Sequence, residues 1–95
     1  MVSFVVRLKF ASEDRAEAAA TLALLARESR REPGCITYIP HQVQDDPDSF
    51  LIYEQYLDAQ ALEAHRASEH FIKHAQNGLY TRIKERVLEN LVALV

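Results

Sequence analysis

The sequence has a single cysteine, Cys35, and no tryptophan among its 95 residues. One cysteine excludes a disulfide framework within the chain and is typical of proteins kept in a reducing compartment. No run of 18 apolar residues is present, so no membrane-spanning helix is expected. Arg7 and Lys9 interrupt the first apolar stretch, which argues against a signal peptide. We therefore expect a cytoplasmic protein.

An excess of positive charge is also missing. The formal net charge is −3, and the arginines near residue 30 are offset by neighbouring glutamates, so no basic surface for nucleic acid is expected. With 48% apolar and 26% charged residues, the composition is that of an ordinary globular protein rather than a disordered one. The length predicts one domain, residues 1–95. A chain this short buries only about two-thirds of its unfolded surface, so we expect oligomerisation to help stabilise it.

Apolar periodicity and turn residues divide the chain into alternating strands and helices. Ser12 is a candidate helix N-cap, Pro33-Gly34 ends that helix, and Asp58 and Ser68 are candidate caps of two later helices. The expected elements are a strand at 2–10, a helix at 12–31, strands at 35–43 and 49–57 joined by a turn at 44–48, a short helix from 58, a second helix at 69–80 and a strand at 86–95.

This order of elements predicts the fold class. Strand, helix, strand, strand, helix, strand is the split β-α-β or ferredoxin-like arrangement, an α+β fold with a four-stranded antiparallel sheet and its helices on one face. The other face would carry aliphatic side chains in a bare monomer. We therefore expect a homodimer in which two sheets pack face to face.

The segment from Tyr53 to Phe71 holds the candidate catalytic pair. Side chains alternate along a strand, so Glu54 shares a face with large apolar neighbours. On the following helix, His65 falls within the stripe that faces the sheet. A short connection packs this helix against its strand, so we expect Glu54 and His65 to occupy one semi-apolar pocket. Such a pocket raises a carboxyl pKa and can set a histidine near neutrality.

Plainer interpretations of these residues exist. His65 could be a buried histidine satisfied by a backbone carbonyl, and Glu54 could pair with Arg7 or Arg66. His70 and His74 are spaced to share a helix face and could bind a metal with His65 as a distant third ligand. Three convergent ligands are needed for a catalytic zinc site, and no spacing here matches a zinc signature, so we expect no metal.

Five segments, in order and at suitable spacing, resemble the antibiotic biosynthesis monooxygenase domain. The resemblance implies a dimeric α/β barrel with a pocket between helices and sheet in each subunit. Some members of that family oxidise hydroquinones or polycyclic phenols with molecular oxygen and no metal or flavin, while others isomerise quorum-signal sugars or degrade haem. The five segments are Glu32-Pro33-Gly34-Cys35-Ile36-Thr37-Tyr38, Asp46-Pro47-Asp48-Ser49-Phe50, Tyr53-Glu54-Gln55-Tyr56, Ala61-Leu62-Glu63-Ala64-His65 and Ser68-Glu69-His70-Phe71.

Within that family the chain resembles the quinol monooxygenase-like subgroup, and this resemblance implies that His65 and Glu54 line the pocket, where we expect them to be the catalytic pair. The haem-degrading branch uses a pocket tryptophan, which this chain lacks, and His74 is not in register with that branch's iron ligand. We therefore expect no cofactor. The residues expected to bind the substrate are His70, Phe71, Tyr53, Tyr56 and Phe50.

Three functions remain open from the sequence. The first is a cofactor-independent monooxygenase in which His65 deprotonates a small hydroquinone or phenol that then reacts with oxygen. The second is an isomerase that uses the same pair to move a proton beside a carbonyl of a small sugar-like substrate. The third is a dimer that binds a small aromatic ligand without catalysis, which would be stabilised by the ligand without forming product. Oxygen uptake during turnover separates the two enzymes.

Overall fold

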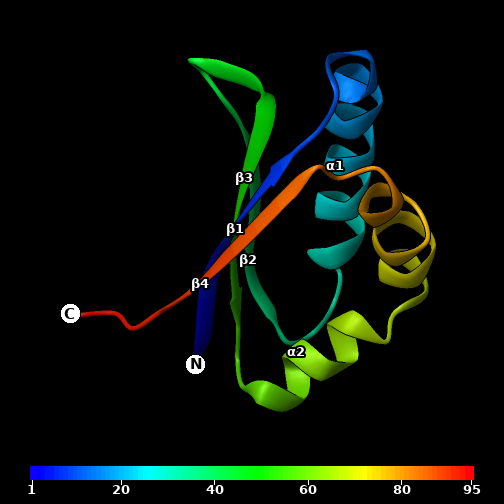
Figure 1. Ribbon diagram of the computed structural model, residues 1–95. Helices are drawn as coiled ribbons and strands as arrows, with labels where there is room; N and C mark the ends of the chain where they lie inside the picture. The colour runs from blue at the N-terminus through cyan, green and yellow to red at the C-terminus, as the bar shows by residue number, and fades with distance from the viewer.

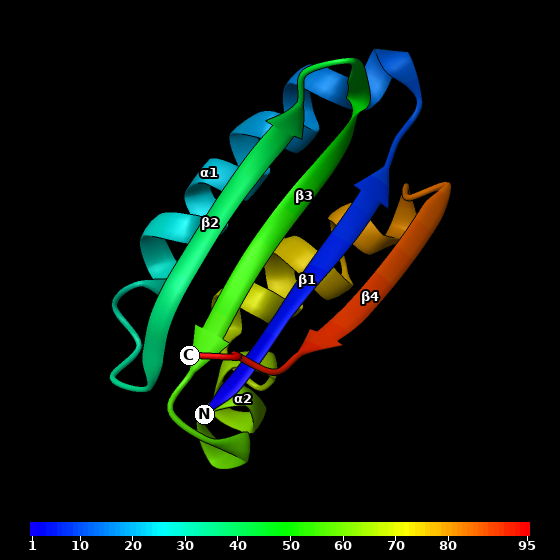
Figure 2. The same cartoon turned by 90° about the vertical axis from the view of Figure 1, so that its left-hand side faces the viewer.

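The computed structural model describes residues 1–95 and consists of one antiparallel sheet with all helical segments on one of its faces (Figure 1). The strand order is β2-β3-β1-β4 (Figure 2). This confirms the predicted α+β, ferredoxin-like arrangement. The elements are β1 (Val2–Lys9), a 3-10 turn η1 (Ser12–Asp14), α1 (Arg15–Ser29), β2 (Cys35–Val43), β3 (Asp46–Tyr56), α2 (Ala59–Arg66), a π-helix η2 (Phe71–Gln76), a 3-10 turn η3 (Leu79–Thr81) and β4 (Glu85–Leu91).

The core lies between the sheet and α1. The alternating pattern of β1 places every second side chain against the helices, and Val6 and Leu8 pair across the sheet with residues of β3 that are equally buried. Helix α1 turns one face towards the sheet, and four of the residues on this face are buried. They are Ala18, Leu22, Leu25 and Ser29.

Several predicted boundaries are wrong. Ser12 does not cap α1, because its hydroxyl donates to Asp48 Oδ2 at 2.9 Å and a 3-10 turn precedes the helix. The third strand begins at Asp46 rather than residue 49, which shortens the predicted turn. The last strand ends at Leu91, since no strand neighbour continues beside the final residues.

The helical segments after β3 cover the other half of the same sheet face. Asp58 caps α2, with its Oδ1 accepting from the Ala61 N–H at 2.8 Å. Ser68 Oγ accepts from the Phe71 N–H at 3.2 Å and begins the next helical turn, as predicted. That second helix is not continuous, because the chain passes from η2 to η3. No helix is long and apolar enough to cross a membrane.

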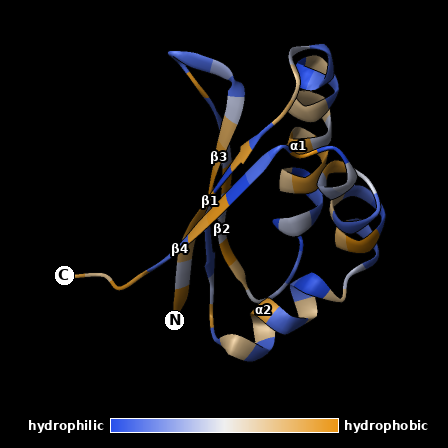
Figure 3. Ribbon diagram, viewed as in Figure 1, coloured by the Kyte–Doolittle hydropathy of each residue, from blue (hydrophilic) through white to orange (hydrophobic).

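The opposite face of the sheet carries no helix (Figures 1 and 3). Cross-strand neighbours Ile39, Tyr53 and Val5 form an apolar row on it, and Val87 on the edge strand β4 is 55% exposed. The segment after β4 runs away from the sheet in Figure 1, and its apolar residues are exposed. The dimeric barrel implied by the family resemblance would require a second chain and stays a prediction.

Candidate functional site: a buried histidine between two glutamates

Glu54 is a buried carboxyl group on the helix-facing side of β3. It is 6% exposed, and its Oε1 accepts a hydrogen bond from the Tyr56 hydroxyl at 2.6 Å. Burial raises the pKa of Glu54 to about 7, and the Tyr56 hydrogen bond opposes this by favouring the charged form. Both protonation states of Glu54 are therefore accessible near neutral pH. The alternative prediction that Glu54 pairs with Arg7 is wrong, because Arg7 forms an ion pair with Asp46 instead.

His65 lies near the end of α2, and its two ring nitrogens face two different carboxyl groups. Nδ1 is 2.9 Å from Glu32 Oε2, and Nε2 is 3.7 Å from Glu54 Oε1. Burial lowers the pKa of His65, although the hydrogen bond with Glu32 works against this effect. The ring is therefore neutral near pH 7. The short contact assigns the proton to Nδ1, which donates to Glu32, and leaves the Nε2 lone pair facing Glu54.

Glu32, which sets the orientation of His65, was not among the predicted site residues. It lies in the turn between α1 and β2, where its N–H donates to the Ser29 carbonyl and its own carbonyl accepts from Cys35. From the sequence alone, Glu32 was interpreted as a negative charge that offsets the nearby arginines. The Pro-Gly pair that follows was the available signal, since such a turn can bring a polar side chain back over the sheet.

Gly34 explains how this turn and α2 come together. A Cβ atom at Gly34 would lie 2.4 Å from the Cβ of Ala61, closer than any two such atoms can approach. The Gly34 carbonyl also accepts from the Leu57 N–H at 2.9 Å, just before α2 begins. The missing side chain therefore lets α2 pack directly on the turn, which brings His65 to Glu32.

His70 and Phe71 complete the surroundings of the imidazole. His70 Nε2 is 2.5 Å from the same Glu32 oxygen that His65 contacts. The Phe71 ring meets the His65 ring edge to face at a centroid distance of 5.1 Å. The ring centroid of Tyr56, which is fully buried, lies 5.0 Å from the ring centroid of His65. Of the predicted site residues, the structure thus brings together Glu54, Tyr56, His65, His70 and Phe71.

Two predicted substrate-binding residues lie elsewhere. Tyr53 is next to Glu54 in sequence and therefore points to the opposite, open face of the sheet. Phe50 points to the same face as Glu54 but lies nearer the beginning of β3, where its ring packs against Phe10 at a centroid distance of 5.9 Å. Strand alternation excludes the first from the cluster, and distance along the strand excludes the second.

Two small hollows meet at Glu54. One, of about 20 Å³, lies in the apolar layer between the sheet and the helices, and the other, of about 50 Å³, includes His65 and lies towards β4. Val6, Phe71 and Tyr80 line both, so only these side chains and Glu54 separate them. Arg66 and Arg86 lie at the second hollow and add positive charge. The space is mostly apolar, with one carboxyl and one imidazole directed into it, and side chains would have to move for a ring-bearing ligand to enter.

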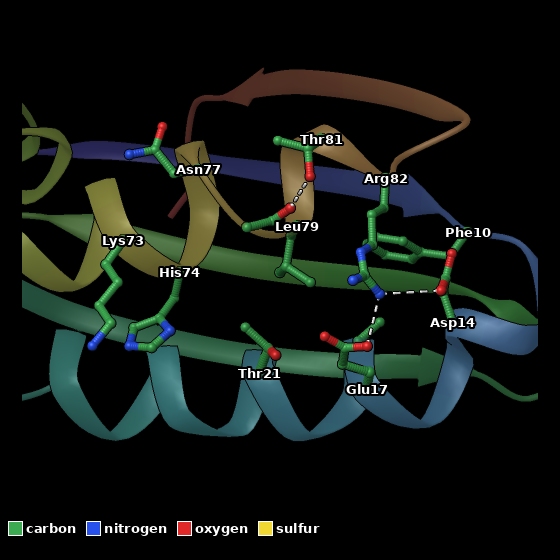
Figure 4. Close-up of a pocket in the computed structure, with 12 residues that line it drawn as sticks. Phe10, Asp14, Glu17, Thr21, Lys73, His74, Asn77, Leu79, Thr81 and Arg82 are labelled. Carbon is green, nitrogen blue, oxygen red and sulfur yellow. Dashed lines mark hydrogen bonds and ion pairs between the residues drawn. The ribbon is translucent and has the colours of Figure 1, made fainter.

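A larger groove lies between α1 and the η2–η3 segment and has a different character (Figure 4). Its lining is mostly polar, and Arg82 crosses it to contact Asp14 and Glu17 at 3.3 Å and 2.7 Å. His74 lines this groove, whereas His65 and His70 are not among its lining residues. The two carboxylates of the groove, Asp14 and Glu17, are accessible to solvent and already paired with Arg82. The histidine cluster around Glu54 is therefore the stronger candidate for an active site.

Comparisons with known proteins identify the family and the fold. Residues 1–77 match the family described as antibiotic biosynthesis monooxygenase. The chain is similar to PA3566 of Pseudomonas aeruginosa, with 28% identity and a TM-score of 0.91 over 99% of this chain and 94% of that one. It is also similar in fold to Rv0793 of Mycobacterium tuberculosis, with 22% identity and a TM-score of 0.89 over 99% and 95% of the two chains.

A further solved structure, described as an antibiotic biosynthesis monooxygenase, has 23% identity and a TM-score of 0.91 over the whole of both chains. No curated protein sequence matches this chain. The similarity is therefore one of fold along the full length and of family over the first 77 residues.

Proposed function

The chain belongs to the antibiotic biosynthesis monooxygenase family, and we propose that it is a cofactor-independent monooxygenase acting on a small hydroquinone or phenol. The observation that carries the proposal is the His65 imidazole, whose Nδ1 is held by Glu32 and whose Nε2 lies 3.7 Å from Glu54 at the edge of the hollow. His65 is a base in the neutral state with its free nitrogen directed inward. Its immediate surroundings are aromatic.

The first step is proton transfer from the ring hydroxyl to His65 Nε2. The resulting phenolate is electron-rich and passes an electron to molecular oxygen, after which the two radicals combine. For a hydroquinone, one oxygen atom replaces a ring hydrogen, the ring ends as a hydroxyquinone, and the second oxygen atom leaves as water. The hydroquinone supplies all the electrons, so the balance needs no further reductant.

Glu32 and Glu54 assist this step in different ways. Glu32 accepts from Nδ1–H and stabilises the imidazolium that forms when Nε2 takes the proton. Glu54, with a pKa raised to about 7 by burial, can hold or release a proton beside the same nitrogen. General-base catalysis of this kind contributes about 10²–10⁴ in rate.

The test is oxygen consumption by chelator-treated protein supplied with a panel of hydroquinones and phenols. With an accepted substrate, His65→Ala should lower turnover by about 10²–10⁴. His74→Ala is the matched control, because it removes an imidazole from the separate groove and should leave turnover unchanged. Full turnover in His65→Ala would exclude His65 as the base.

An acid–base isomerase is the second candidate, favoured by one observation. A carboxyl group with a pKa of about 7 and a neutral imidazole lie 3.7 Å apart, which suits the removal of a proton at one atom and its return at another. Such a reaction would proceed equally well without oxygen. Turnover of a sugar-like carbonyl substrate under anaerobic conditions would favour the isomerase.

We also propose that a second copy of the chain covers the open face of the sheet. The apolar row of Val5, Ile39 and Tyr53 would be buried in such a dimer, as would Val87 near the edge. Tyr53→Arg would place a charge in the centre of that face and should shift the protein to monomers in sedimentation experiments. A wild-type protein that is monomeric at high concentration would contradict the proposal.

A further inference from the structure

We propose that Glu32, His65 and His70 form a binding site for a divalent transition-metal ion of the Zn²⁺ type, which switches off the base function of His65. One oxygen atom, Glu32 Oε2, lies 2.9 Å from His65 Nδ1 and 2.5 Å from His70 Nε2. The three possible ligand atoms all lie within 4.8 Å of one another. The inhibitory part of this inference rests on the proposed function, while the binding part does not.

The donor set selects the kind of ion. Two imidazole nitrogens and one carboxylate oxygen are ligands that Zn²⁺, Co²⁺ and Ni²⁺ prefer, whereas Mg²⁺ and Ca²⁺ require oxygen ligands. With metal–ligand bonds of about 2.1 Å in a tetrahedron, the ligand atoms would be separated by about 3.4 Å. The short contacts need to open by less than about 1 Å each, which side-chain rotations can provide. The ion would then lie where the hydrogen-bonding protons lie now.

The surroundings fit a site with an open coordination position. The side chain of His65 is 3% exposed, whereas those of Glu32 and His70 are 16% and 19% exposed, so one side of the cluster is open to water. The second nitrogen of His65 faces Glu54, and a carboxyl group beside the outer nitrogen is the usual support of a metal-bound histidine. The tight packing of Gly34 on Ala61 holds the turn that carries Glu32 against the helix that carries His65.

Metal binding would change the direction in which His65 can transfer a proton. In the metal-free protein, His65 Nδ1 and His70 Nε2 each carry a proton donated to Glu32. When both nitrogens bind the ion, each loses the proton that it donated to Glu32, and the neutral His65 ring takes up a proton from water on its other nitrogen, so His65 releases no net proton. His65 then carries its proton on Nε2, so it faces the hollow as a donor and can no longer act there as a base.

The first experiment measures binding of ZnCl₂ to chelator-treated protein by calorimetry, without any substrate. We expect one Zn²⁺ per chain, with affinity lowered at least about tenfold in Glu32→Gln and in His70→Gln. His74→Ala is the matched control and should bind as the wild type does. Absence of binding, or equal binding by wild type and both ligand variants, would overturn the proposal.

A second measurement uses the unmodified protein, so it does not depend on the folding of variants. In ¹⁵N NMR of the histidine rings, stoichiometric Zn²⁺ should shift the resonances of His65 and His70 and leave those of His41 and His74 in place. Shifts confined to His41 or His74 would contradict the site. MgCl₂ at the same concentration should change none of them.

Inhibition is tested last and is separate from the proposed function. With an accepted substrate, one equivalent of Zn²⁺ should abolish most of the oxygen uptake, and excess chelator should restore it. If Zn²⁺ binds the trio but uptake is unchanged, the switch is wrong and the binding site stands. If chelator-treated protein consumes no oxygen with any substrate, the proposed monooxygenase is wrong, and the calorimetric result is unaffected.

Discussion

The two ends of β3 carry acidic side chains in opposite environments. At its beginning, Asp46 and Asp48 lie at the surface beside basic and hydroxyl side chains, and hydrogen bonds from Ser49 and Arg15 lower their pKa values. Near its end, Glu54 is buried with one hydrogen-bond donor, and its pKa rises to about 7. One strand therefore holds carboxylates that stay charged at its exposed end and a carboxyl group that can exchange a proton at its buried end.

The comparison shows what makes an acid useful for chemistry near neutral pH. Asp48 has three donor contacts, two from Arg15 and one from Ser12, which fix it in the charged form and join the 3-10 turn to the sheet. Glu54 has only the Tyr56 hydroxyl, too little to offset the loss of water around the charge. The first arrangement stabilises the fold, and the second supplies a proton donor or acceptor beside His65.

The largest effect should come from Glu54→Gln. Because the folded pKa of about 7 exceeds the unfolded value, the folded wild type holds a proton that the unfolded chain releases between about pH 4.5 and 7. Stability should therefore fall by about 3 kcal/mol as pH rises through this window, and level off above it. In Glu54→Gln this loss should be absent.

The measurement is urea unfolding from pH 4.5 to 9 in chelator. The difference between the two proteins is the quantity to compare, because His65 has a lowered pKa and contributes the opposite slope below its ordinary pKa. The other charged groups around Glu54, namely Glu32, Arg66 and Arg86, are the same in both. A wild type and a variant with parallel pH profiles would show that Glu54 does not titrate in this range.

A smaller effect is expected from Tyr56→Phe, which removes the only donor to Glu54. The hydrogen bond favours the charged carboxylate, so its loss should raise the pKa of Glu54 further. The destabilisation should be about 1 kcal/mol at pH 5 and about 2 kcal/mol at pH 9, where Glu54 is ionised. Unfolding at these two pH values tests this, and a cost independent of pH would mean that only packing was lost.

The smallest effect should come from Asp48→Asn at the exposed end of β3. The lowered pKa of Asp48 means that its contribution is present at neutral pH and is lost as pH falls through the folded value. Wild type and variant should therefore converge at pH values below the lowered folded pKa of Asp48, and should differ less in 1 M salt, which screens surface pairs. Thermal unfolding in low and high salt is the measurement. A difference larger than that of Tyr56→Phe would contradict the comparison.

Local patterns in the sequence predicted much of the fold. The alternation in the first strand and the caps at Asp58 and Ser68 depend on neighbours within a few residues, so they could be recognised without coordinates. Ser12 has the right residue type for a cap, but a distant partner, Asp48, takes its hydroxyl. The predicted end of the last strand was wrong because it depends on where the neighbouring antiparallel strand β1 begins, Leu91 being paired with Ser3.

The candidate site divides in the same way. Glu54 and His65 follow from strand and helix periodicity, which decides the face on which each side chain lies. Glu32 could not be recognised in this way, because it lies in a turn, and its position over His65 depends on the packing of Gly34 against Ala61. Tyr53 and Phe50 have suitable residue types but the wrong face and the wrong distance along the strand.

By itself, then, the sequence determined the order of the elements, the inward faces and the presence of a carboxyl group and an imidazole on those faces. The tertiary structure decided that one glutamate oxygen contacts two histidines and that the same imidazole faces a second, buried glutamate. The physical reason is range. Periodicity is a local property of the backbone, whereas proton affinity and metal affinity depend on groups brought within a few ångströms by chain segments far apart in sequence.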